Sequence, residues 1–242
     1  METNQIIEYL NPNDDQKRML LDLPPKKGRY KQTVDLNGNT LWFYWIKMKN
    51  PLKKWKRWER KLQSIDINLV NKKNEHILYK IILEGNLELW NWFNNKYNNI
   101  VIDKANIWGE NEIHAAVWAN NIEMLKYYID RNVNLDLQNK DGVTPIMIAT
   151  NRNLEIARML LLAGADPNIS DNKNKNALHY AAETLDTEMY VLIEDCGGDY
   201  KQKDILGRIP EDIYNKTLEK SNREIEANIN YWIKQYERRK EL

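Results

Sequence analysis

Self-similarity at a regular spacing is the feature that most constrains the fold of this 242-residue chain. Gly142 has counterparts at Gly109, Asn174 and Gly207, so the interval is roughly 33 residues each time. Periods of roughly 20–50 residues are typical of solenoids, in which each repeat is too small to bury its own apolar face. The spacing therefore predicts stacked repeats.

Each copy of the period contains the signals for two short helices. Thr144 is a suitable N-cap, and Pro145 follows it at the first helical position, where a missing N–H costs nothing. A second apolar stretch ends at Gly164, where a left-handed residue is favoured. Gly197 repeats this stop in the next copy, and Asn132, which tolerates positive φ, takes its place in the preceding copy. The sequence thus predicts a helix–turn–helix in each copy.

These copies resemble ankyrin repeats over about residues 106–203. The resemblance rests on the segments TPIMIA (144–149), GADPN (164–168), ALHYAA (177–182), EIHAAV (112–117) and GGDYK (197–201). It is weaker over 72–105, where residues 77–93 look like a degenerate repeat, and over 204–239, where residues 223–239 are predicted to form a charged capping helix as the second half of the last repeat. The resemblance implies a mainly α fold, an ankyrin-type α-solenoid of about five helix-turn-helix repeats.

Residues 1–63 do not follow the repeat and are predicted to be a separate segment, which leaves residues 64–242 as the repeat domain. Asn37-Gly38 lies between two alternating apolar stretches and predicts an N-terminal β-hairpin with a type I′ turn. An amphipathic helix is expected from Pro51 onward. Its apolar face consists of Leu52, Trp55, Trp58 and Leu62.

The opposite face of this helix is basic, and two interpretations of it stay open. Residues 1–63 carry 14 Lys and Arg against 7 Asp and Glu, although the whole chain has a net charge of only +1. In the first interpretation the tryptophans pack on the first repeat and the cations are solvated. In the second, residues 26–61 bind the phosphates of a nucleic acid. The candidate nucleic-acid-binding residues are Lys53, Lys54, Lys56, Arg57, Arg60 and Lys61.

The sequence contains no HExxH, glycine-rich phosphate loop or GxSxG motif. Cys196 is the single cysteine, which excludes an intrachain disulfide and favours a reducing compartment. His114 and His179 share a register at which ankyrin-like repeats typically hydrogen-bond to the backbone of the turn. We therefore predict a non-enzymatic protein with no catalytic residues, cofactor, metal or small-molecule substrate. Chemistry from scattered residues is the alternative that a single sequence leaves open.

The chain is expected to be cytoplasmic and to have no membrane contact. Its first residues do not resemble a secretory leader, and its apolar runs are far shorter than the ~20 residues needed to cross a bilayer.

Solenoids present turn tips and first helices on a concave face, and we predict that a partner protein binds there. By register, the candidate partner-binding residues are Trp108, Glu110, Trp118, Lys140, Asp141, Asn151, Arg152, Lys173, Lys175, Glu183 and Arg208. Tryptophan is enriched among residues that dominate interface energies. In the alternative interpretation, Trp108 and Trp118 pack between irregular neighbouring repeats.

The predicted function is that of a protein-binding adaptor or inhibitor. A composition rich in Asn, Lys and Ile adds the hypothesis of a viral or symbiont factor that acts on a host protein. The alternative is a protein that contacts nucleic acid through its N-terminal segment.

Overall fold

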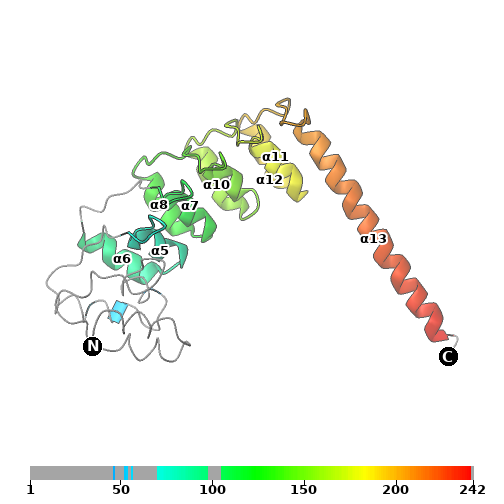
Figure 1. The fold of residues 1–242 in the computed structure, drawn as a ribbon, viewed down its shortest axis with the longest axis horizontal. Helices are drawn as coiled ribbons and strands as arrows, with labels where there is room; N and C mark the ends of the chain where they lie inside the picture. The colour runs from blue at the N-terminus through cyan, green and yellow to red at the C-terminus, as the bar shows by residue number, and fades with distance from the viewer. Residues whose placement is uncertain (1–45, 47–51, 54–55, 57–69, 98–104, 241–242) are drawn as a thin grey trace. The chain divides into compact units, whose positions relative to one another are not determined.

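The computed structural model describes residues 46, 52, 53, 56, 70–97 and 105–240, and for 232–240 it describes the backbone alone (Figure 1). These residues fall into two compact units on either side of the Lys140–Asp141 junction, and each unit is described by itself. Regular structure in this part of the chain is α-helical, and an isolated antiparallel bridge joins Val70 to His76.

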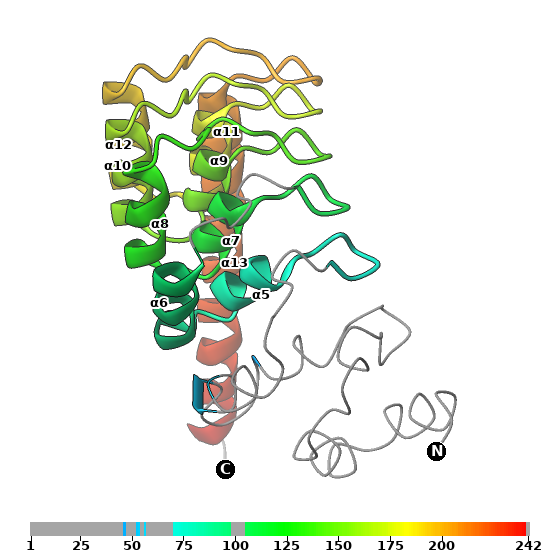
Figure 2. The same ribbon diagram turned by 90° about the vertical axis from the view of Figure 1, so that its left-hand side faces the viewer.

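The first unit contains two helical hairpins. Helix α5 (Ile77–Leu83) is followed by α6 (Leu87–Lys96), and α7 (Glu112–Trp118) is followed by α8 (Ile122–Ile129). Helix α5 packs on α7, and the ring of Trp90 in α6 lies 4.5 Å from that of Tyr127 in α8 (Figure 2). The segment predicted to be a degenerate repeat is therefore a complete helix pair.

The second unit contains two further hairpins and one long helix. The hairpins are α9 (Pro145–Ala149) with α10 (Leu154–Leu162) and α11 (Ala177–Thr184) with α12 (Thr187–Asp195), and α13 spans Pro210–Lys240. Helix α11 contacts both α9 and α13, whereas α12 contacts α10. We call α9, α11 and the start of α13 the inner helices and α10 and α12 the outer helices (Figure 2).

A recurring turn precedes α5, α7 and each of the inner helices. In the described residues it begins with Asn or Asp at 71, 106, 139, 171 and 204, and its fourth residue is Gly or Asn with positive φ. The first side chain closes the turn: Oδ1 of Asp171 accepts the N–H groups of Lys173 and Lys175, each at 2.8 Å. The left-handed fourth residue is required because the chain reverses within this ring of hydrogen bonds.

Backbone hydrogen bonds join successive turns within each unit. In the first unit the N–H of Lys140 donates to the carbonyl of Trp108 at 2.7 Å, and in the second the N–H of Ile205 donates to the carbonyl of Lys173 at 2.9 Å. Each repeat is thereby tied to the next at its turn as well as through its helices.

The predicted helix stops are confirmed. Gly164 and Gly197 have φ values of +96° and +93°, and Asn132 has a φ of +52°.

Residues 223–239 are helical as predicted, but they do not form a helix of their own, because α13 runs without a break from Pro210 to Lys240. Three of the four complete pairs reverse at a left-handed residue, namely Gly85, Asn120 or Leu185. No glycine occurs in α13, and no proline follows Pro210. Nothing in its sequence therefore stops the helix at the point where a second helix was expected.

Most of the N-terminal predictions lie outside the described residues. The β-hairpin lies outside them apart from Ile46, which lies in a turn. The boundary at residue 63 also lies outside them. Leu52, Lys53 and Lys56 are helical, with Leu52 buried and both lysines exposed. These three positions agree with the expected amphipathic helix.

Substitution of Gly142 by alanine should destabilise the protein far more than the same change at Gly207. Both glycines have positive φ, +79° and +75°, but a Cβ on Gly142 would lie 2.6 Å from the backbone N of Asn172, whereas none of the surrounding atoms lies within 4 Å at Gly207. We expect losses of at least about 3 kcal/mol and about 1 kcal/mol respectively in urea unfolding. Equal losses would show that the close approach between the two turns is not real.

Candidate protein-binding surface

In the first unit, Glu110 connects the predicted surface residues. Its Oε2 accepts a hydrogen bond from the Tyr79 hydroxyl at 2.7 Å, and its Oε1 accepts one from Nε1 of Trp118 at 3.2 Å. Burial, with Glu110 nearby, raises the pKa of Tyr79, so this hydroxyl stays a donor. Trp118 keeps 37% of its surface exposed.

Trp108 and Lys140 lie on neighbouring turns of the same unit. Trp108 is 41% exposed, and Nζ of Lys73 lies 4.9 Å from the centroid of its ring. Lys140 is exposed and contributes its backbone N–H to the hydrogen bond with Trp108. Both tryptophans among the candidate partner-binding residues thus lie at the surface.

Four predicted residues of the second unit lie at turns and are exposed. Asp141 and Lys173 belong to the turns before α9 and α11, and Asn151 and Arg152 lie in the reversal between α9 and α10. The carbonyl of Asp141 accepts the backbone N–H of Asn172 at 2.9 Å.

Lys175 and Glu183 form an ion pair at the edge of α11. Nζ of Lys175 also lies 5.7 Å from the ring centroid of Tyr180, whose hydroxyl donates to the Asp171 carboxylate at 2.8 Å. Burial and this hydrogen bond raise the pKa of Tyr180, which remains a phenol. The Lys175–Glu183 ion pair and the Tyr180–Asp171 hydrogen bond therefore both hold the turn before α11.

Arg208 is fixed by the buried carboxylate of Asp204. Its Nε and one terminal nitrogen donate to Oδ2 of Asp204 at 2.9 and 2.6 Å. Burial tends to raise the pKa of Asp204, but hydrogen bonds from Arg208 and from the backbone of Leu206 lower it to about 2. Nε2 of His179, whose pKa is lowered by burial, lies 3.2 Å from the Arg208 carbonyl. The predicted backbone contact of this histidine is confirmed.

An open groove of about 630 Å³ lies between α11 and α13. Two predicted residues, Glu183 and Arg208, line it. Three basic residues of α13 that sequence reasoning missed also line it, and these are Lys216, Lys220 and Arg223. Arg223 was missed because the inner helix was expected to end before it, whereas Lys216 and Lys220 fall inside the expected helix and were not recognised as a set with it. Their spacing of four and three residues, which places them on one helix face, is the signal that could have found them.

The groove thus contains an excess of positive charge. Four of its lining residues are basic and two, Glu183 and Glu224, are acidic. Asp141, Asn151, Arg152 and Lys173 do not line it.

Buried polar groups in the first unit have a structural role. His76 caps α5, its Nδ1 accepting the N–H of Tyr79 at 3.3 Å, and its Nε2 lies 2.6 Å from Oε1 of Glu112. Both side chains are almost fully buried, so these two atoms face each other away from solvent. In the described part of the chain no three His, Cys, Asp or Glu residues come together as metal ligands.

Of the six candidate nucleic-acid-binding residues, the structure describes Lys53 and Lys56, and both are exposed. Lys54, Arg57, Arg60 and Lys61 lie outside the described residues. Among the helices that are described, none is both long enough and apolar enough to cross a membrane.

Stacked helix pairs joined by capped, hydrogen-bonded turns define a repeat protein. Residues 113–204 match the family described as ankyrin repeats, in three copies. This part of the chain therefore consists of ankyrin repeats.

Two curated relatives match stretches of this chain. Cyclin-dependent kinase 4 inhibitor B from Bos taurus is 30% identical over 86 residues, which are 35% of this chain and 66% of the relative. Neurogenic locus notch homolog protein 1 from Danio rerio is 35% identical over 65 residues, 26% of this chain and 3% of the relative. The chain spans just under two thirds of the first relative and a small part of the second.

The contribution of Asp204 to stability should disappear in acid. Because its pKa is lowered in the folded state, the contribution is complete above the ordinary aspartate pKa near 4 and is lost as the pH falls through about 2. In urea unfolding, the advantage of the wild type over Asp204→Asn should therefore shrink between about pH 4 and pH 2. A difference that stays constant over this range would contradict the assignment.

Proposed function

We propose that this protein is an adaptor or inhibitor that binds an acidic segment of a partner protein in the groove between α11 and α13. The groove is the observation that carries the proposal, because it gathers Arg208, Lys216, Lys220 and Arg223 beside residues predicted to bind a partner. The ankyrin repeats and the likeness to Cyclin-dependent kinase 4 inhibitor B support a protein-binding role.

The cations of α13 are available to a partner. Lys220 lies 3.8 Å from Glu224 and Arg223 lies 3.7 Å from Glu219, and the four side chains of these two pairs are between 66% and 76% exposed. Exposed pairs of this kind contribute little, so a partner carboxylate can replace either glutamate at small cost. Lys216 has no ion-pair partner among the described residues, which leaves its charge uncompensated.

The turn tips extend this surface with apolar contacts. Ile205 and Leu206, on the turn before α13, are 65% and 70% exposed. They follow Asp204 directly and precede Arg208, so apolar and basic groups lie within one turn. A partner segment that combines acidic and apolar residues fits this arrangement.

Two finer hypotheses have narrower support. Nucleic-acid binding by the N-terminal segment rests on the basic sequence of residues 26–61 and on the exposure of Lys53 and Lys56. Origin as a viral or symbiont factor rests on composition alone.

Charge reversal in the groove should remove partner binding. The proteins that co-purify with the wild-type chain from its source cells are identified by mass spectrometry, and the affinity of each purified partner is then measured for Lys216→Glu with Lys220→Glu. We expect a loss of at least about tenfold, and a wild-type affinity that falls as salt rises.

The matched control is Lys126→Glu with Arg158→Glu, which reverses two exposed charges on α8 and α10. Its partner affinity should stay within about twofold of the wild type. If the groove variant keeps its partner, the groove is not the binding site. If the co-purifying species is a nucleic acid whose binding falls with salt, the N-terminal alternative replaces this proposal.

A further inference from the structure

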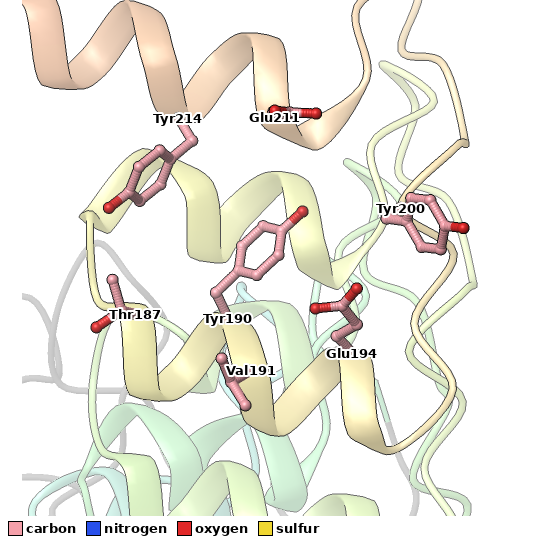
Figure 3. Close-up of a pocket in the computed structure, with 7 residues that line it drawn as sticks. All are labelled: Thr187, Tyr190, Val191, Glu194, Tyr200, Glu211 and Tyr214. Atoms are coloured by element: carbon pink, nitrogen blue, oxygen red, sulfur yellow. The ribbon is translucent and has the colours of Figure 1, made fainter.

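A second hollow of the second unit lies between α12 and the start of α13 (Figure 3). It has a volume of about 320 Å³, and three of its seven lining residues are tyrosines. The rings of Tyr190 and Tyr214 are 6.4 Å apart at 63°, and Tyr200 lies on the loop that follows α12. Val191 and Tyr200 are 51% and 48% exposed, so apolar surface is open to solvent here.

The preceding repeat shows which element covers the equivalent surface of an outer helix. Helix α12 packs on α10, outer helix on outer helix. Ala157 and Leu161 of α10 are buried, and their counterparts one repeat later, on α12, are Tyr190 and Glu194, which line the hollow. The hollow is therefore the position that the next outer helix would occupy. No such helix is present in the described part, because α13 does not turn back.

Helix α13 carries a matching apolar stripe. At about 100° per residue, Tyr214, Leu218, Ile225 and Ile229 lie within roughly 60° of arc. Leu218, Ile225 and Ile229 are 39%, 52% and 52% exposed. In the sequence, Trp232 and Tyr236 continue the same spacing. The stripe thus starts at the wall of the hollow and runs along the helix with no described element covering it.

We propose that the protein forms a two-fold dimer in which residues 222–240 of each copy occupy the hollow of the other as its missing outer helix. An exchanged element of this kind makes the contact self-complementary, as a two-fold interface requires. The inserted segment is long enough, because the second helices of the four pairs (α6, α8, α10 and α12) have 8 to 10 residues.

Charge also favours a second copy as the occupant. The hollow contributes two carboxylates, Glu194 and Glu211, on opposite walls. The final part of α13 has the opposite sign in sequence, with Lys234, Arg238, Arg239 and Lys240 against Glu237. An antiparallel arrangement of the two long helices brings these groups together and places Asn222 near the symmetry axis.

The test is the mass of the 242-residue chain by sedimentation equilibrium over a range of concentrations. We expect twice the 28.9 kDa of the single chain for the wild type. Ile225→Asp with Ile229→Asp should be monomeric, and Val191→Asp should be monomeric as well. Far-UV circular dichroism checks that each variant keeps its helices.

The matched control is Asn230→Asp with Tyr231→Asp, which adds the same charge to α13 away from the stripe and should remain a dimer. A monomeric wild type overturns the proposal, and so does a Val191→Asp variant that stays dimeric, since pairing would then not use the hollow. Insertion of Gly-Asn-Gly after Lys220 should give a folded monomer, because the segment can then turn back onto its own chain. Persistence of the dimer in this variant contradicts the exchange.

Discussion

The fold depends on a turn whose backbone N–H groups are hydrogen-bonded by the side chain of the turn's first residue. The Asn or Asp at its first position accepts the N–H groups of the third and fifth residues, as Asp204 does for Leu206 and Arg208 at 2.8 and 3.0 Å. These groups would otherwise need water or a strand partner. With the turn closed locally, the neighbouring backbone groups can bond to the next turn, and the inner helix that follows is placed for packing on its neighbour.

Where the sequence repeats itself, it predicts the structure well. Gly164, Gly197 and Asn132 end their helices in the left-handed conformation because each choice of residue is a local requirement of the backbone. Residues 77–93 could be placed as a helix pair for the same reason, although their motif is degenerate. The repeat register was enough to predict which residues lie at the turns. It could not predict which of these residues line the same groove, because that depends on the course of α13.

The continuation of α13 is the departure with the widest effect. A helix ends only where its sequence supplies a stop, and residues 216–224 supply none. One continuous helix then brings Lys216, Lys220 and Arg223 to the groove on one side and leaves Tyr190 and Val191 partly open on another. Both the proposed partner site and the proposed exchange between copies follow from this single local feature.

Within each turn, the positions that hold the fold differ from the positions whose side chains vary from repeat to repeat. The first residue holds the turn with its side-chain acceptor, and the fourth holds it with its left-handed backbone. The second and third residues form the links between turns through their backbone N–H and C=O groups, and every residue except proline possesses both. The same two places accordingly hold Ile107 and Trp108 in one repeat, Asn172 and Lys173 in another, and Ile205 and Leu206 in a third. The exposed side chains at these two places can thus change through many successive substitutions while the stability of the scaffold changes little.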